Sequence, residues 1–192
     1  MRRIVLVRHS VPETGGVKMC LGSGTDPGLS REGAALCAET EKLLRSVPAD
    51  NIYSSPLARA RRTAELLFPG RKAAVIADLR EIYMGAWDGL SFDEIKRGYP
   101  DLYARRGEDP SLLPPGSESW EEVSERMERA VLSTEGNCIA VSHAGAIKSL
   151  ILKIRGCDFR SIGSFKLGYC SMTTLFEDSG ILYTEEQLSK LS

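Results

Sequence analysis

Short, continuous runs of apolar residues, separated by segments with helical periodicity, most limit how this chain can fold. Residues 4–7 and 139–141 are the clearest of these runs, and residues 52–53 and 73–77 are weaker ones. A strand without polar alternation is typical of a sheet that is covered on both faces, because neither face meets water. The alternation of such runs with helices predicts an α/β fold, a three-layer α/β/α sandwich around a mostly parallel central sheet.

Helix start signals precede the segments between these strands. The predicted N-caps are Ser30, Ser55, Ser91 and Ser119. The helix after Ser30 runs to about Arg45, and Pro56 stands at the first helical position after Ser55. Ser91 and Ser119 are each followed three residues later by glutamate, which is the capping-box pattern. A further helix is predicted over residues 144–154, ending near Gly156.

The C-terminal third predicts shorter strands at residues 165–167, 171–176 and 181–184, with a hairpin turn at residues 178–180 between the last two. Residues 107–119 form the longest segment without a periodic pattern. We interpret this segment either as a lid over a site or as a surface loop.

Length and charge limit the classes of protein to consider. The chain has 192 residues, which suits one domain over residues 1–192, as a monomer or homodimer. The formal net charge is −1, so no overall field attracts nucleic acid or an anionic membrane. No apolar run approaches the roughly 20 residues of a membrane span. Five cysteines without a C-x-x-C pattern indicate reduced thiols in a cytoplasmic protein with no metal site.

The chain contains only two histidines, His9 and His143, and each comes at the end of a predicted buried strand. Ligands of open α/β sheets bind beyond the carboxyl ends of the strands, so neighbouring strands would bring both histidines to one crevice. A neutral imidazole is a good nucleophile toward phosphorus. Arg8, beside His9, offers a planar set of donors that matches phosphoryl oxygens. The Arg8-His9 pair therefore predicts phosphoryl-group chemistry, with His9 as the nucleophile.

Two further side chains would complete such a site. Arg59 lies early in the helix after Pro56, where backbone N–H groups also favour anions. In the alternative interpretation, Arg59 lies with Arg61 and Arg62 on a basic face of the helix that is exposed to solvent. Glu81 precedes the glycine-containing segment 85–89 and is a candidate acid for the leaving alkoxide, although a surface carboxylate is the ordinary alternative.

The motifs around these residues resemble those of the histidine phosphatase superfamily, in its phosphoglycerate-mutase-like branch. The resemblance covers residues 4 to about 150, and the motifs occur in the family's order. Besides Arg8-His9, the matching segments are residues 26–33 (D-x-P-L-S-x-x-G), 54–64 (S-P-L-x-R-A-x-x-T-A), 79–89 (L-x-E-x-x-x-G-x-W-E/D-G), 115–119 (P-G-G-E-S) and 141–145 (V-S-H-x-G).

The resemblance implies a metal-independent phosphomonoesterase that acts on a small-molecule phosphate monoester and requires no cofactor. His9 would attack the phosphoryl group and become phosphohistidine. Arg8, Arg59 and His143 would bind the phosphate and stabilise the transition state. Glu81 would protonate the leaving oxygen and then deprotonate the water that hydrolyses the intermediate.

Some positions depart from the family pattern. Ser10 stands where the family usually has glycine, and it is either tolerated there or adds a phosphate contact through its hydroxyl. The backbone N–H of Ala144 is a further candidate phosphate donor. Gly15 occupies the place of an asparagine found in many members, and Ser117 replaces the second glycine of P-G-G-E-S.

The same site serves mutases and phosphatases. A mutase must shield phosphohistidine from water and hold a second phosphate, and the chain is short for that, so hydrolysis is favoured. Residues 11–13 and 18–26, which include Cys20, Gly22 and Asp26, resemble the α-ribazole phosphatase group, whose substrate is α-ribazole 5′-phosphate. A phosphoglycerate-type mutase, a broad-specificity or phosphoprotein phosphatase, and a non-catalytic binding module are the alternatives.

Overall fold

The computed structural model describes residues 1–189 of the chain. In this part, one mixed sheet has the strand order β3-β2-β4-β1-β5-β6. The strands are β1 (Arg2–Arg8), β2 (Asn51–Ser54), β3 (Ala74–Val75), β4 (Cys138–Ser142), β5 (Met172–Asp178) and β6 (Ile181–Thr184). The neighbours from β3 to β1 are parallel, whereas β5 runs antiparallel to both β1 and β6. The predicted domain extends to residue 192, and residues 190–192 lie outside the described part.

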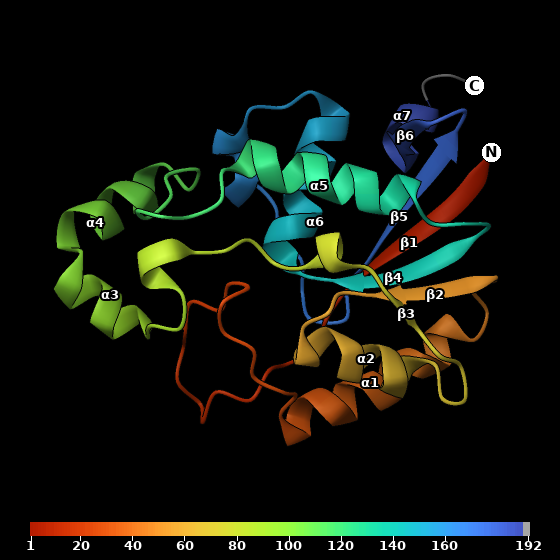
Figure 1. Cartoon of the computed structure of the whole chain (residues 1–192), viewed down its shortest axis with the longest axis horizontal. Coiled ribbons are helices and arrows are strands. Elements are labelled where there is room, and N and C mark those ends of the chain that lie inside the picture. The colour runs from red at the N-terminus through yellow and green to blue at the C-terminus, as the bar shows by residue number, and fades with distance from the viewer. Residues whose placement is uncertain (190–192) are drawn as a thin grey trace.

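Helices cover both faces of this sheet. The α-helices are α1 (Arg31–Leu44), α2 (Ala58–Leu67), α3 (Phe92–Gly98), α4 (Pro100–Glu108), α5 (Trp120–Leu132), α6 (Ala144–Arg155) and α7 (Glu185–Leu188). Single 3-10 turns are η1 (Ala77–Leu79), η2 (Gly85–Trp87) and η3 (Phe159–Gly163). Helices α1 and α2 lie on one face of the sheet, and α5 and α6 lie on the other (Figure 1). The predicted three-layer α/β/α sandwich is confirmed.

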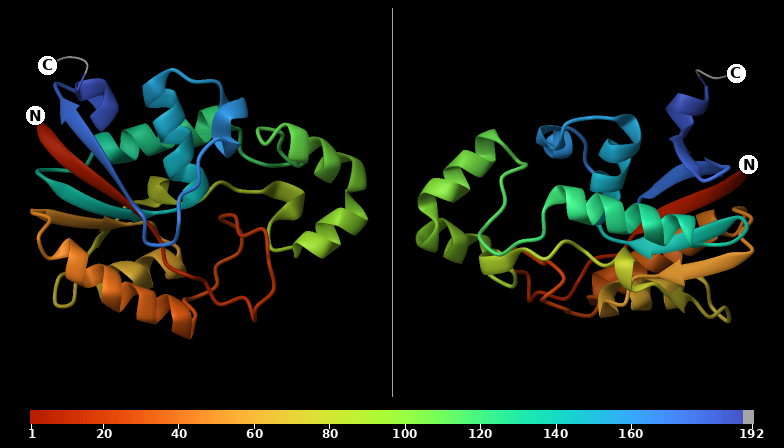
Figure 2. Two further views of the ribbon diagram at one scale, coloured as in Figure 1. Left: turned by 180° about the vertical axis from the view of Figure 1, so that it is seen from behind. Right: turned by 45° about the horizontal axis from the view of Figure 1, so that its top comes forward.

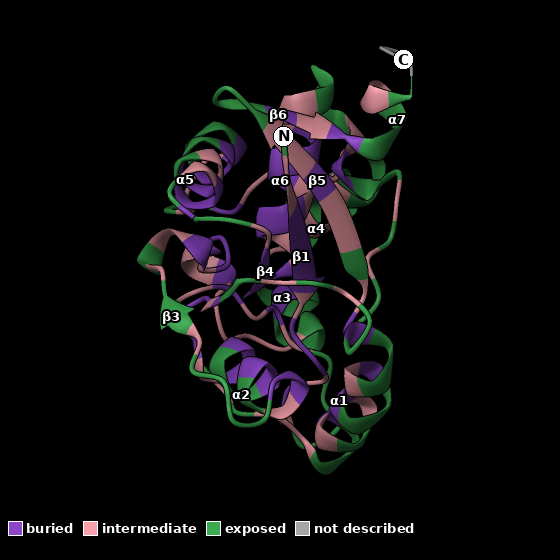
Figure 3. Ribbon diagram, turned by 90° about the vertical axis from the view of Figure 1, so that its right-hand side faces the viewer, coloured by how far each residue is buried: buried purple, intermediate pink, exposed green. Residues whose placement is uncertain are grey.

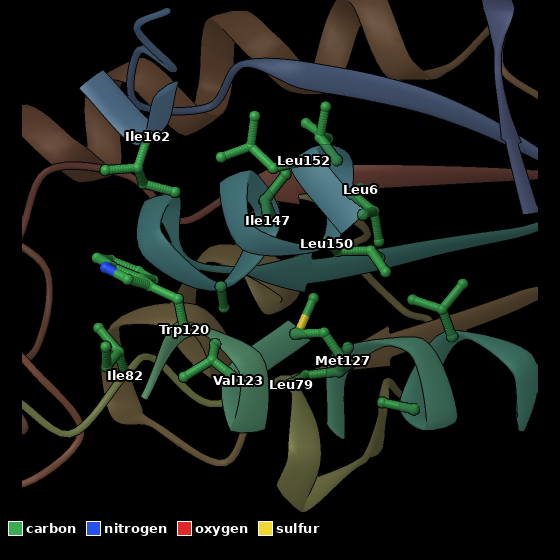
Figure 4. Packing of buried hydrophobic residues seen from close by; sticks show 14 of the residues in the cluster. Leu6, Leu79, Ile82, Trp120, Val123, Met127, Ile147, Leu150, Leu152 and Ile162 are labelled. Carbon is green, nitrogen blue, oxygen red and sulfur yellow. The ribbon is translucent and has the colours of Figure 1, made fainter. Parts of the chain in front are cut away.

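The side chains of β1 show why its apolar run is continuous. Ile4 and Leu6 pack into the core beneath α5 and α6, while Val5 and Val7 pack into the core beneath α1 and α2. All four are buried. Figure 4 shows Leu6 among side chains of α5 and α6, and Figure 3 shows the buried residues gathered between the layers. Successive strand side chains point to opposite faces, so a strand between two helical layers must be apolar throughout.

Helices α3 and α4 lie outside the sandwich. They extend beyond the end of the sheet where β1 finishes, next to the long connection after β1 (Figures 1 and 2). The predicted capping box at Ser91 opens α3, and Pro100 occupies the first turn of α4. Within residues 1–189, none of the helices combines the length and the apolar character that crossing a bilayer requires.

Two predicted elements differ in the structure. The strand predicted at residues 165–167 is wrong, because this segment is irregular and the Leu167 carbonyl accepts from the Arg8 guanidinium at 2.6 Å. The predicted N-cap at Ser55 is also wrong. Helix α2 starts at Ala58, with Leu57 as its N-cap, and the carboxylate of Asp26 accepts from the Ala58 N–H at 2.7 Å. A distant aspartate thus satisfies the helix start that Ser55 was expected to cap.

The segment at residues 107–119 begins within α4 and continues as a loop that is bonded to its neighbours. The Pro115 carbonyl accepts from Ala86 at 2.9 Å, and the Glu118 N–H donates to the Tyr83 carbonyl at 3.1 Å. The Ser111 carbonyl accepts from the indole of Trp120 at 2.9 Å. These bonds favour the interpretation as a surface loop over the interpretation as a lid.

Candidate active site

His9 and His143 lie side by side at the carboxyl ends of two neighbouring parallel strands. Arg8 of β1 is in register with Ser142 of β4, and His9 and His143 come directly after these two residues. The centroids of the two imidazole rings are 4.9 Å apart. The structure therefore brings together the two histidines that the sequence placed at strand ends.

One hydrogen bond defines the protonation of His9. Its Nδ1 lies 2.6 Å from the carbonyl oxygen of Ser10. A carbonyl oxygen only accepts, so Nδ1 carries the proton and Nε2 keeps its lone pair. Burial, with the charges of Arg59 and Arg8, lowers the pKa of His9 from 6.5 to about 3. His9 is consequently a neutral imidazole at pH 7, which is the nucleophilic form.

His143 is fully buried and bonded on one side only. Its Nε2 lies 2.7 Å from Oγ of Ser55, and that oxygen also accepts from the Leu57 N–H at 3.2 Å. The Ser55 hydroxyl can then donate to Nε2, which leaves the proton of His143 on Nδ1. Nδ1 is buried and has no partner among residues 1–189. Burial lowers the pKa of His143, and repulsion between protons on the two imidazoles and from the Arg59 charge lowers it further.

Two arginines surround the histidines with positive charge. Arg59 is fully buried, and its guanidinium donates to the carbonyls of Thr25 at 2.8 Å and Gly22 at 2.9 Å. The interpretation of Arg59 as part of a solvated face is therefore wrong. Arg8 donates to Leu167 and keeps its Nε buried. Neither Nε has a partner in the described chain. Unpaired buried donors are costly, so these nitrogens fit an anionic ligand.

Glu81 is held at the N-terminus of α6. Its Oε1 accepts from the Ala146 N–H at 2.9 Å and its Oε2 from the Gly145 N–H at 3.1 Å. The side chain of His143, the N-cap residue of α6, makes no capping hydrogen bond, so Glu81 caps the helix from a distant part of the chain. A Cβ on Gly145 would lie 2.6 Å from Oε1 of Glu81, so glycine permits the close approach.

A buried arginine that the sequence analysis did not single out anchors the backbone of Glu81. Arg126 of α5 donates to the carbonyls of Asp78, Arg80 and Glu81 at 2.7–3.0 Å. Its guanidinium also pairs with the carboxylate of Glu118 at 2.9 and 3.0 Å. The only signal in the sequence is an arginine within the apolar face of a predicted helix. Glu118, from the P-G-x-E-S segment, is thus part of the scaffold of the site.

The other predicted phosphate contacts have different outcomes. The Ser10 hydroxyl donates to the Gly33 carbonyl at 2.8 Å, and the Ser10 N–H donates to Oγ1 of Thr63 at 3.0 Å. Ser10 therefore joins β1 to α1 and α2. Because its hydroxyl already donates to Gly33, the structure favours the alternative in which serine is tolerated here over the one in which it contacts phosphate. Ala144 is the first residue of α6, and its N–H makes no hydrogen bond within residues 1–189.

Tyr169 and Lys148 also lie at this site, although no sequence motif identified them. The Tyr169 ring centroid is 5.8 Å from that of His9, and Cζ of Arg8 lies 3.9 Å from it. Lys148 donates to the Ile162 carbonyl at 2.9 Å. Burial, followed by the charge of Arg8, lowers the pKa of Lys148. No group of three or more histidine, cysteine or acidic side chains in residues 1–189 is placed to hold a metal ion.

Comparisons with known proteins identify the family of this chain. The family model of the histidine phosphatase superfamily (branch 1) matches residues 4–182. The chain belongs to this superfamily. A solved structure, Bacillus stearothermophilus YhfR, superposes with a TM-score of 0.86 at 26% identity and covers 96% of each chain.

Two curated relatives show how far the similarity extends. A bifunctional protein of Mycobacterium tuberculosis is 34% identical over 157 residues, which cover 78% of this chain and 43% of that protein. The chain thus spans less than half the length of this mycobacterial relative. The adenosylcobalamin/alpha-ribazole phosphatase of Salmonella typhimurium is 27% identical over 173 residues, or 86% of this chain and 85% of that enzyme.

Proposed function

We propose that this protein is a phosphomonoesterase that hydrolyses a small-molecule phosphate ester through a phosphohistidine intermediate on His9. The observation that carries the proposal is the state of His9. Its Nδ1 donates to the Ser10 carbonyl, so the lone pair on Nε2 is free for attack. Around it, Arg8, Arg59 and His143 each keep a buried nitrogen that has no partner in residues 1–189. A phosphoryl group would supply the missing acceptors.

In the first step, Nε2 of His9 attacks phosphorus and the bond to the ester oxygen breaks. Arg8 and Arg59 donate to the equatorial oxygens, where negative charge is concentrated in the transition state. The Nδ1–H of His143 donates to the same group. The positive charge that develops on His9 is stabilised by its bond to the Ser10 carbonyl. Glu81, in its protonated form, transfers its proton to the leaving alkoxide.

In the second step, water attacks the phosphohistidine. The carboxylate of Glu81 removes a proton from the water, the P–N bond breaks, and its electron pair returns to Nε2 of His9. Inorganic phosphate leaves, and Glu81 is protonated again for the next turnover. The anchors of Glu81 at Gly145, Ala146 and Arg126 support its role, because they hold the carboxylate at one place at the end of the sheet.

We propose α-ribazole 5′-phosphate as the substrate to test first. Residues 11–13 and 18–26 resemble the α-ribazole phosphatase group, and the Salmonella relative carries alpha-ribazole phosphatase in its name. We also place the protein in the cytoplasm. The five cysteines all have free thiols in the structure, which is consistent with a reducing compartment.

The test compares phosphate release from α-ribazole 5′-phosphate by wild type and by His9→Ala, each with and without EDTA. We expect EDTA to have no effect and His9→Ala to lower kcat by about 10³-fold or more, because the covalent route is lost. Rapid acid-free quenching followed by mass spectrometry should detect one added phosphoryl group on the peptide that contains His9. Turnover that survives in a folded His9→Ala protein, or that EDTA abolishes, would refute the mechanism.

A further inference from the structure

Arg8 is bonded to the loop that leads into β5, residues 167–171. Its Nη1 donates to the Leu167 carbonyl at 2.6 Å. On the backbone, the Arg8 N–H donates to the Ser171 carbonyl and the Cys170 N–H donates to the Arg8 carbonyl, both at 3.0 Å. Bonds to both the side chain and the backbone of one residue fix where Arg8 and this loop lie relative to each other.

The side chain of Tyr169, in the middle of the loop, covers the face of the same guanidinium. Cζ of Arg8 lies over the Tyr169 ring, 3.9 Å from its centroid. This is a close cation–π contact, since such pairs extend to roughly 6 Å. The centroid of the Tyr169 ring is also 5.8 Å from that of His9. Tyr169 therefore lies beside both members of the Arg8-His9 pair.

The backbone after Tyr169 has a conformation that side chains rarely adopt. Cys170 has a φ of 56°, in the left-handed region where residues other than glycine are uncommon. The Ser171 N–H donates to the Gly168 carbonyl at 3.1 Å and closes the turn around Tyr169. An unusual backbone conformation persists only where surrounding contacts hold it, so the loop fixes the position of the Tyr169 ring.

These contacts leave one edge of the Arg8 guanidinium free. Nη1 is engaged by Leu167, whereas neither Nε nor Nη2 has a hydrogen bond within residues 1–189. Nε and Nη2 form a pair of parallel donors that matches two oxygens of a phosphoryl group. The Leu167 carbonyl prevents the guanidinium from turning within its own plane. The Tyr169 ring, packed against the face, prevents the plane from tilting.

We propose that Tyr169 is a positioning residue, whose ring holds the guanidinium of Arg8 with its Nε and Nη2 edge toward the phosphoryl group on His9. The proposal rests on the proposed phosphatase function and adds a residue that acts through Arg8. A bidentate contact needs both donors aligned, so a tilted guanidinium loses one of its two hydrogen bonds. The competing role is direct contact with the leaving group, since Tyr169 is 38% exposed.

Inorganic orthovanadate separates the two roles, because it takes the place of the phosphoryl group and has no leaving group. Tyr169→Leu removes the ring and Tyr169→Phe keeps it. By isothermal titration calorimetry, we expect the Kd of orthovanadate to rise about ten-fold in Tyr169→Leu and to stay within about two-fold of wild type in Tyr169→Phe. An unchanged Kd in Tyr169→Leu would overturn the proposal. A loss seen only in kcat/KM for p-nitrophenyl phosphate would assign Tyr169 to the leaving group instead.

A double-mutant cycle shows whether Tyr169 acts through Arg8. In an Arg8→Ala background no guanidinium remains to be positioned, so adding Tyr169→Leu should change kcat/KM for p-nitrophenyl phosphate by less than about two-fold. In the wild-type background the same substitution should lower kcat/KM about ten-fold. A merely structural ring would cost the same factor in both backgrounds, and that result would overturn the proposal.

Two further variants guard against trivial causes. Tyr169→Gln, a second replacement without a ring, should repeat the loss, so the result does not depend on how leucine fits the loop. Tyr183→Leu is the matched control, because Tyr183 is half-buried in the edge strand β6, which β5 separates from β1. Its Kd for orthovanadate and its kcat/KM should equal those of wild type.

The failure of this inference is distinguishable from the failure of the phosphatase function. Wild-type turnover that depends on His9, combined with wild-type values in Tyr169→Leu, would overturn the role of Tyr169 alone. Absence of turnover in wild type, or turnover that survives in His9→Ala, would overturn the phosphatase function and this inference with it.

Discussion

At the scale of single residues, burial keeps His9 neutral and one acceptor sets its tautomer. Only 5% of its surface is exposed, and two arginine charges act on it, so protonation is disfavoured. The Ser10 carbonyl at 2.6 Å holds the remaining proton on Nδ1. The side chain of Ser10 has no part in this, because its hydroxyl is bonded to Gly33. A backbone carbonyl supplies the contact, so the residue type at position 10 affects the proposed nucleophile, His9, only indirectly.

The lowered pKa of His9 predicts how stability depends on pH. The folded-state pKa is about 3 and the ordinary value is 6.5, so between these values the unfolded chain binds a proton that folded His9 does not. The free energy of unfolding should therefore fall as the pH decreases below 6.5, by about 1.4 kcal/mol per pH unit for His9. The pKa of His143 is shifted in the same direction and adds to the slope.

Urea unfolding at pH 7, 6 and 5 measures this slope. Between pH 6 and 5, the free energy of unfolding of His9→Asn should change less with pH than that of wild type, because one of the two titrating imidazoles is gone. Identical slopes for the two proteins would contradict the assignment of a low pKa to His9.

At the scale of elements, the start of α6 serves the site and the fold together. The helix follows His143 directly, and its second and third N–H groups bind Glu81. A helix N-terminus has unpaired donors and a partial positive charge, so a carboxylate is well placed there. The glycine of the V-S-H-x-G motif is explained by this contact, since Gly145 leaves space for Oε1 of Glu81.

Gly145→Ala tests the placement of Glu81. Alanine is a better helix former than glycine by about 1 kcal/mol, but here its Cβ would collide with the carboxylate. We expect kcat to fall about ten-fold or more, because small displacements of a reacting group are costly. Gly107→Ala in α4 is the control, since a Cβ there meets nothing within 4 Å. It should leave kcat unchanged. Unchanged kcat in Gly145→Ala would show that the observed position of Glu81 is irrelevant to turnover.

At the scale of the whole molecule, the sheet order assembles the site. Strands β2, β4 and β1 are adjacent, so the segments that follow them carry Arg59, His143 and His9 to one end of the sheet. Glu81 comes from the connection between η1 and η2. Arg126 links that connection to α5, one of the two helices that cover this face. The helical layer thus holds Glu81, the proposed acid, in place through a buried network.

Arg126→Met tests this network. Removing the guanidinium leaves three backbone carbonyls without this donor and takes two hydrogen bonds from Glu118, which keeps those from Arg80 and the Tyr83 N–H. We expect a loss of about 3–5 kcal/mol in the free energy of unfolding. Arg129→Met in the same helix is the matched control. The side chain of Arg129 is 66% exposed and 3.9 Å from Asp78, so the expected loss is below about 1 kcal/mol. Urea unfolding at pH 7 compares the two variants, and equal losses would contradict a special role for Arg126.

Local sequence patterns correctly predicted the features that depend on residues close together in the chain. The apolar runs of β1 and β4 and the capping boxes at Ser91 and Ser119 depend on neighbours within a few residues, and they appear as predicted. The strand predicted at residues 165–167 failed because Phe165 and Leu167 are half-buried against the core from a loop. Ser55 failed as a cap because Asp26 supplies the carboxylate to α2 from 32 residues away.

The sequence alone determined the layers of the fold, the two strand ends that carry His9 and His143, and the order of the motifs, because periodicity and capping are written in nearby residues. Tertiary structure decided which nitrogen of His9 is free, how strongly its proton is disfavoured, and where Glu81 is held. These properties arise from contacts such as that between Glu81 and Gly145, which are 64 residues apart. Burial and hydrogen bonding at such distances exist only after the chain has folded.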